Sequence, residues 1–292
     1  MQPAERTYTT SDGTNLPLRV WSPSKKGPGT FLARPAAMVY LHGIQSHSGW
    51  YGGSSRRLAE AGVAVYQVER RGSGCDADHE RGHVDKAETW MEDVARAAEL
   101  ARDETGAPRV HLMGVSWGGK LALACAAHRP DLYRSLILSA PGIIPVVDVA
   151  LATKVRVAKC LMTGQERRRF PIPLGDPHLF TENPERVRYI AEDALSLREL
   201  TARFMYESRR LDAMVRAAAA TVGAPTLLAL AERDRVINNE ATRSLVYSMT
   251  ARKRVITYPG AHHTLEFEVD PQPYFKDIVA WIEQVEREAR KV

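Results

Sequence analysis

The stretch LMGVSWGGK, residues 112–120, places Ser116 between two glycines in a G-x-S-x-G pattern. It stands between a strand-like run, RVHLM, and a helix-like run, LALACAAH. A strand-to-helix turn this sharp forces its central residue into a strained conformation and lifts its hydroxyl above the sheet edge. The flanking Gly114 and Gly118 fit because a Cβ at either position would clash inside so tight a turn. The stretch therefore predicts that Ser116 is a nucleophile.

The rest of the chain alternates short apolar runs, rich in β-branched residues, with amphipathic helical patterns. Seven segments read as strands: 16–22, 36–42, 63–69, 109–115, 135–140, 225–231 and 254–258. The main helical patterns are residues 49–62, 87–106, 117–128 and 274–290. Such alternation is typical of a mostly parallel sheet with helices on both faces, so we expect an α/β fold.

One segment interrupts this alternation. Residues 143–221 contain helical patterns, the Pro-rich turn FPIPLGDP and no convincing strand. An all-helical block between two sheet strands indicates an inserted cap. We therefore expect a core from residues 1–142 and 222–292, with a helical cap over residues 143–221.

Composition narrows the class of protein. The 292 residues are 44% hydrophobic and 26% charged, with a formal net charge of +5, as in an ordinary globular protein. The densest basic run, Arg167–Arg169, has no interleaved aromatic residues suited to base stacking, so we expect no nucleic-acid partner. The three cysteines lie far apart, and the first residues lack the pattern of a signal peptide. The longest apolar stretch, residues 136–152, is broken by prolines and Asp148, so we expect a cytoplasmic protein without a membrane span.

A serine hydroxyl needs a base to remove its proton and an acid to orient that base. In this architecture the order along the chain should be serine, then Asp or Glu, then His, each after a later strand. Asp234 follows the strand-like PTLLALA, and His262 and His263 follow RVITYPG. The order fits a Ser–Asp–His triad, with either histidine as the base.

The oxyanion of such a reaction needs backbone N–H donors fixed in advance. We expect one donor at Trp117, directly after Ser116, and the other at Ile44, after the strand-like AAMVYLHG. Gly43 lets that second backbone segment approach the substrate closely.

Five motifs together, LHGIQSHSGWY, RRGSG, GVSWGG, AERDRVI and GAHHTL, resemble the α/β-hydrolase superfamily. The chain is most similar to its monoacylglycerol lipase and lysophospholipase-like branch. The resemblance implies an eight-stranded, mostly parallel sheet, a helical cap, and ester hydrolysis without a metal or organic cofactor. It also implies that His263, three positions after Gly260, is the working base, with His262 at the rim. Glu69 departs from the family, in which an Asp is common before the Arg-Gly-x-Gly loop.

The sequence thus predicts a serine hydrolase that cleaves a monoacylglycerol, a lysophospholipid or a similar acyl ester through an acyl-enzyme on Ser116. The alternatives are a thioesterase or acyltransferase acting on a carrier- or CoA-bound acyl group, with an acyl carrier protein docking near Arg167–Arg169. A C–C bond hydrolase or a non-catalytic receptor is a further alternative. The apolar start of the cap could contact a lipid surface. One segment contains Asp76, Asp78, His79, Glu80 and His83, and because it lies between a Gly-rich loop and a helix we interpret it as a polar surface loop rather than a metal site. The Arg70–Arg71 pair is a structural feature or an anion site.

Overall fold

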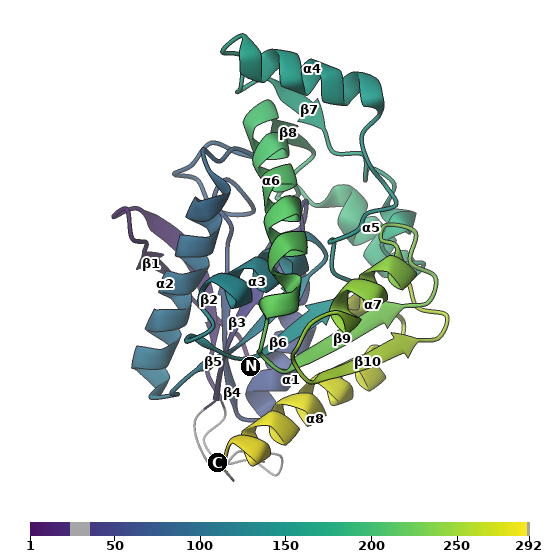
Figure 1. The fold of residues 1–292 in the computed structure, drawn as a ribbon. Coiled ribbons are helices and arrows are strands. Elements are labelled where there is room, and N and C mark those ends of the chain that lie inside the picture. The colour runs from purple at the N-terminus through teal and green to yellow at the C-terminus, as the bar shows by residue number, and fades with distance from the viewer. Residues whose placement is uncertain (24–35, 291–292) are drawn as a thin grey trace.

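The computed structural model describes residues 1–23 and 36–290. Its centre is an eight-stranded sheet in the order β1-β2-β4-β3-β5-β6-β9-β10 (Figure 1). The six strands from β4 to β10 in this order are parallel, and β1 and β2 extend one edge as antiparallel strands. The strands are β1 (Ala4–Thr9), β2 (Asn15–Trp21), β3 (Ala36–Leu41), β4 (Val63–Val68), β5 (Val110–Val115), β6 (Tyr133–Ser139), β9 (Thr226–Ala231) and β10 (Lys253–Tyr258). The expected mostly parallel eight-stranded sheet is confirmed.

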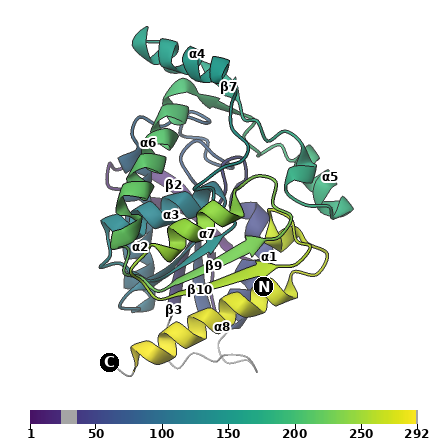
Figure 2. The same cartoon turned by 45° about the vertical axis from the view of Figure 1, so that its right-hand side comes forward.

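Helices cover both faces of the sheet. The core helices are α1 (Gly52–Glu60), α2 (Ala87–Thr105), α3 (Trp117–His128), α7 (Asn239–Tyr247) and α8 (Gln272–Ala289). Helix α1 packs on α8, while α2 packs on α3. Figure 2 shows α7 and α8 on opposite sides of β9 and β10. Every residue of β3, β4, β5 and β9 is buried, because these strands are covered on both faces.

The sequence patterns missed two elements that have few buried residues. Strand β1 was not predicted, because five of its six residues are exposed and its sequence, AERTYT, has no apolar alternation. Helix α7 was missed as well, since only Thr242 and Val246 are buried on it. Both elements owe their place to the tertiary structure: β1 pairs along its length with β2, and α7 packs on β9 and β10.

The segment expected to form the cap, called the cap below, lies between β6 and β9 and contains helices α4 (Leu151–Met162), α5 (Pro184–Glu192) and α6 (Ala202–Ala218). The expectation of an all-helical block was wrong in one respect. Strands β7 (Arg169–Pro171) and β8 (Glu199–Thr201) form a separate antiparallel pair. Each has three residues and β7 includes a proline, so neither is long enough to show a period of two. Helix α6 packs on α3 and carries α4, which is the outermost helix in Figure 1.

The basic run of the cap is joined to the core by ion pairs, because Arg167 and Arg169 both pair with Glu80.

Within residues 1–23 and 36–290, no helix is long and apolar enough to cross a membrane.

Candidate active site

Ser116 sits at the turn between β5 and α3 in a backbone conformation that L-residues rarely adopt, with φ 53° and ψ −124°. The glycines around it are required by contact. A Cβ on Gly118 would lie 2.5 Å from the carbonyl oxygens of Leu41 and His42, and a Cβ on Gly114 would meet the carbonyl of Gly118. Two hydrogen bonds stabilise this strained backbone conformation: Gly119 N and Gly142 N both donate to the Ser116 carbonyl, at 2.9 and 2.7 Å.

The side chains of Ser116, His263 and Asp234 form one hydrogen-bonded chain. His263 Nε2 lies 2.8 Å from Ser116 Oγ, and His263 Nδ1 lies 2.8 Å from Asp234 Oδ2. An ionised carboxylate only accepts hydrogen bonds, so Nδ1 carries the ring hydrogen and Nε2 accepts from the serine hydroxyl. Both His263 and Asp234 have side chains that are 1% exposed or less. This is the arrangement in which an imidazole can take a proton from a serine.

Backbone donors fix the Asp234 carboxylate in this orientation. Its Oδ1 accepts from Val236 N at 2.8 Å and from Ile237 N at 3.0 Å, which leaves Oδ2 for His263. The acid loop and the histidine loop are also joined directly, since Arg233 N donates to the Ala261 carbonyl at 2.8 Å.

The neighbouring His262 faces another carboxylate. Its backbone N donates to Glu268 Oε1 at 2.7 Å, and its Nδ1 lies 3.1 Å from the same oxygen. Of the two histidines, only His263 has a hydrogen bond to Ser116.

Ile44 and Trp117, the expected oxyanion donors, line the same cavity as Ser116. Trp117 is the first residue of α3, so its N–H is among the four that have no partner inside the helix. At Gly43 an added Cβ would lie 3.1 Å from Ser46 Oγ, a tight contact, and 3.4 Å from Ser116 Cβ, an ordinary one, so this segment passes next to the serine. The assignment of these two N–H groups as oxyanion donors stays a prediction.

The sequence did not predict the residue that holds the Ile44 loop. Arg70 is buried and donates to the carbonyl of Gly43 at 3.0 Å and to that of Ile44 at 2.6 Å. Its guanidinium also lies over the Trp117 ring, 4.8 Å from the centroid. Both expected oxyanion segments therefore contact one side chain. The RRGSG motif pointed to this loop, but a sequence does not show which carbonyls an arginine reaches.

Glu69, the departure from the family pattern, is buried beside this loop. Its Oε1 lies 2.9 Å from His42 Nε2, and Ser48 Oγ donates to its Oε2 at 2.8 Å. Burial alone would raise the pKa of the Glu69 carboxyl, but the His42 imidazole and the Ser48 hydroxyl hold it below its ordinary value. Among the residues that the structure describes, Oε2 of the longer side chain has hydrogen-bond donors, whereas Oε1 lies against the His42 ring without a hydrogen-bond partner.

The polar loop after Gly74 and the second arginine are structural. Asp76 accepts from Gly72 N at 2.7 Å and lies 2.9 Å from His79 Nδ1, so its carboxylate closes the loop. Arg71 donates to both carboxylate oxygens of Asp93, at 2.6 and 2.7 Å. Among the residues that the structure describes, no three His, Cys, Asp or Glu side chains are placed to hold a metal ion.

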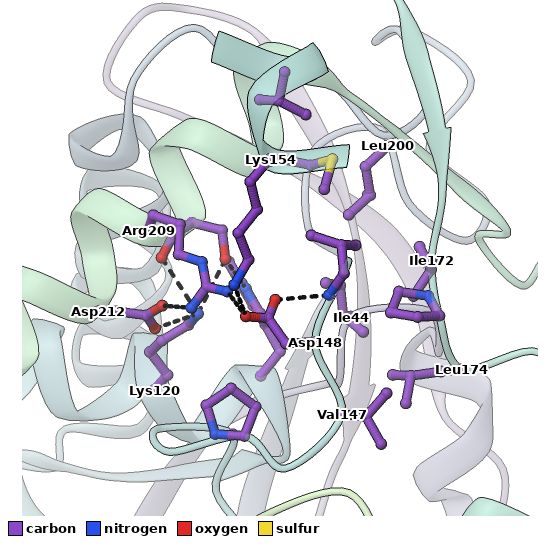
Figure 3. Close-up of a pocket in the computed structure, with 18 of the residues that line it drawn as sticks. Ile44, Lys120, Val147, Asp148, Lys154, Ile172, Leu174, Leu200, Arg209 and Asp212 are labelled. Atoms are coloured by element: carbon purple, nitrogen blue, oxygen red, sulfur yellow. Dashed lines mark hydrogen bonds and ion pairs between the residues drawn. The ribbon is translucent and has the colours of Figure 1, made fainter. Parts of the chain in front are cut away.

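A cavity of about 340 Å³ opens from Ser116 under the cap. Its lining is mostly apolar and comes from the core and from cap segments far apart in sequence. Figure 3 shows Ile44, Val147, Ile172, Leu174 and Leu200 on one side of this cavity, and charged side chains on the other. A cavity of this size and polarity is typical of a small-molecule site.

Comparison with known proteins identifies similar chains. The family model described as serine aminopeptidase, S33, matches residues 33–270. A monoacylglycerol lipase from Mycolicibacterium smegmatis is 27% identical over 282 residues, which cover 96% of this chain and 96% of that protein. The monoglyceride lipase of Homo sapiens is 27% identical over 282 residues, covering 94% of this chain and 88% of that protein.

The fold has a close match among solved structures. The crystal structure of the monoacylglycerol lipase of Paleococcus ferrophilus superposes with a TM-score of 0.80 at 24% identity. The match covers 93% of this chain and 100% of that one. The central sheet and its flanking helices are thus shared over nearly the whole length of both chains.

Proposed function

The chain belongs to the serine aminopeptidase S33 family, within the monoglyceride lipase-like branch of the α/β-hydrolases, and we propose that it hydrolyses a carboxylic ester of a monoacylglycerol, a lysophospholipid or a similar acyl compound. The single observation that carries this proposal is the hydrogen-bonded chain from Ser116 through His263 to Asp234, which ends at an apolar cavity.

In the first half of the reaction, Ser116 Oγ attacks the acyl carbonyl carbon while His263 Nε2 takes the hydroxyl proton. The carbonyl oxygen becomes an oxyanion, which the N–H groups of Ile44 and Trp117 stabilise. The tetrahedral intermediate then expels the alcohol, which leaves with the proton from His263. Ser116 is left as an acyl ester.

In the second half, water attacks the acyl carbon and gives a proton to His263 Nε2. Collapse of the second tetrahedral intermediate releases the carboxylic acid, and the proton returns to Ser116 Oγ. In both halves Asp234 holds the tautomer that leaves Nε2 free to accept. The carboxylate also stabilises the imidazolium that forms.

The cavity supports the proposed substrate class. An acyl chain buries apolar area against side chains such as Ile172, Leu174 and Leu200, at about 0.8 kcal/mol for each buried CH₂. The cap thus supplies most of the surface that distinguishes one acyl group from another.

The outer face of the cap supports contact with a lipid surface. Leu151, Val155 and Met162 of α4 are 76%, 62% and 87% exposed, and Arg156 and Lys159 lie on the same helix. Exposed apolar side chains beside basic ones fit the boundary between acyl chains and anionic head groups. We expect the cap to reach acyl esters held in such a surface.

The activity is tested with 4-nitrophenyl esters of short and long acyl chains and with a fluorophosphonate probe. We expect the wild type to hydrolyse the esters and to react with the probe at Ser116. Ser116→Ala should abolish labelling and reduce kcat by at least roughly 10³-fold. An unlabelled wild type, or an Ala variant that retains its activity, would show that this chain is not a serine hydrolase.

A further inference from the structure

One wall of the cavity is charged, although the rest of the lining is apolar. The charged side chains come from α3, from the start of the cap, from α4 and from α6: Lys120, Asp148, Lys154, Arg209 and Asp212. Figure 3 shows them together on the side of the cavity opposite Ile172, Leu174 and Leu200. A charged group in a mostly apolar cavity is costly unless it is paired or serves a ligand.

The five groups form one chain of ion pairs. Lys120 Nζ lies 2.7 Å from Asp212 Oδ1, and Lys154 Nζ lies 2.6 Å from Asp148 Oδ2. Arg209 stands between the two carboxylates and pairs with both. Three cations thus share two carboxylates, and the wall has one positive charge in excess.

The inner end of this wall is fixed next to the candidate nucleophile. Lys120 is buried, and its Nζ also donates to Ser208 O at 3.3 Å and to Ser208 Oγ at 3.0 Å. The same hydroxyl accepts from Trp117 Nε1 at 2.9 Å. Trp117 directly follows Ser116, so Lys120 and the residue next to the serine share one hydroxyl partner.

The outer end is open. The side chains of Lys154 and Arg209 are 46% and 45% exposed, against 5% for Lys120. A group that enters the cavity can therefore reach the ammonium of Lys154 and the guanidinium of Arg209.

The charge balance decides the sign of that group. Each carboxylate is already shared, Asp148 by Lys154 and Arg209, and Asp212 by Lys120 and Arg209. A cationic ligand would compete with these fixed cations for the same oxygens. An anion instead meets N–H donors whose charge the carboxylates do not fully balance, and charge-assisted hydrogen bonds of this kind are strong.

We propose that this cavity accepts an acyl ester with a second, anionic group, a carboxylate or a phosphate, which Arg209 and Lys154 bind; the proposal rests on the ester hydrolase function above. The group is either the far end of the acyl chain or part of the alcohol. In both cases the apolar side holds the methylene chain while the charged wall holds the anion.

Two matched pairs of substrates, used below their aggregation concentrations, test this. The first pair is 4-nitrophenyl octanoate and the mono-4-nitrophenyl ester of octanedioic acid, which places the anion on the acyl chain. The second is 1-octanoylglycerol and its 3-phosphate, which places the anion on the alcohol. We expect kcat/KM to be at least roughly tenfold higher for the anionic member of one pair. The pair that shows the gain identifies the position of the anion.

Variants of the wall residues distinguish binding of the anionic group from a purely structural role of these side chains. Lys154→Gln and Arg209→Gln should lower the anionic-to-neutral ratio of kcat/KM by roughly tenfold. Asp148→Asn should raise the ratio, because it removes a competing carboxylate. Arg156→Gln is the control: this residue lies on the same helix, its guanidinium stands over the Phe170 ring, and the ratio should not change. If the wall were only structural, every wall variant would affect both members of a pair equally.

The outcomes for this proposal and for the proposed function are distinct. Hydrolysis of the neutral esters with no preference for either anionic partner overturns the anion site and leaves the hydrolase function in place. Absence of hydrolysis for all four esters contradicts the hydrolase function. In that case calorimetric titration of Ser116→Ala with methyl octanoate and monomethyl octanedioate still decides the anion site, and equal affinity for the two would overturn it.

Discussion

The adjacent imidazoles of His262 and His263 face different carboxylates. His263 Nδ1 lies 2.8 Å from Asp234, and His262 Nδ1 lies 3.1 Å from Glu268. Only His263 is also within hydrogen-bonding distance of Ser116. A difference of one position in the chain thus separates a histidine in the candidate site from one that closes a loop.

Substitution of each histidine in turn tests this separation. His263→Ala should lower kcat for an activated ester by at least roughly 10³-fold, because Ser116 loses its base. His262→Ala should retain kcat within about threefold, with a slightly lower Tm from the lost contact to Glu268. Steady-state kinetics and a thermal melt on both proteins measure the two effects. A larger loss of kcat in His262→Ala than in His263→Ala would show that His262, and not His263, is the base.

Arg70 should act as a positioning residue for the oxyanion loop. Arg70→Met removes the donors to the Gly43 and Ile44 carbonyls, so the segment from which we expect an oxyanion donor loses this support. We expect kcat to fall by roughly 10- to 100-fold, which is less than the loss of a whole oxyanion donor, with KM within about threefold.

A boronic acid that mimics the tetrahedral intermediate distinguishes this role from general destabilisation. Its affinity for Arg70→Met should fall in parallel with kcat, and Arg70→Lys should recover part of both. A variant that folds, keeps its kcat and binds the boronic acid normally would rule out the positioning role.

Glu266 should make stability depend on pH. Burial raises the pKa of this carboxyl to about 7, although Ser54 and the backbone N–H groups of Gly53 and Ser54 favour the ionised form. The folded state then holds a proton that the unfolded chain releases near pH 4.5. The stabilisation is complete below that pH and is lost as pH rises toward 7, by up to roughly 3 kcal/mol.

The matched variant is Glu266→Gln, which keeps the shape of the protonated acid. Urea unfolding of both proteins at pH 5 and pH 8 measures the difference. The free energy of unfolding of the wild type should fall relative to the variant between these two values. A constant difference across that range would mean that Glu266 is ionised in the folded protein at pH 5.

The exposed face of α4 should control access to aggregated substrate. Replacement of Leu151, Val155 and Met162 by serine should reduce co-sedimentation with vesicles that contain anionic lipid. Turnover of a dissolved short-chain ester should stay within about twofold, because these side chains lie outside the cavity lining. Tyr247→Ser is a control, since Tyr247 is exposed on α7 of the core. Equal vesicle binding by the triple variant and the wild type would contradict a role for this face.

The parts of the fold that the sequence predicted are those with a strong local signal. The buried strands read as continuous apolar runs. Ser116 is recognisable because the positions two residues before and after it must be glycine, since a Cβ there would clash with the backbone. Strand β1 and helix α7 have few buried residues, so their conformation depends on neighbours that a local pattern does not contain. The same holds for β7 and β8, which exist only as a pair.

By itself the sequence determined seven strands of the central sheet and the turn around Ser116, because periodicity and steric demand are local properties. Only the tertiary structure decided which groups converge. Arg70 reaches two carbonyls across the loop, His263 and not His262 reaches Ser116, and five charges from four segments meet on one wall of the cavity. The physical reason is that the direction of a side chain and the identity of its neighbours depend on contacts between residues far apart in sequence.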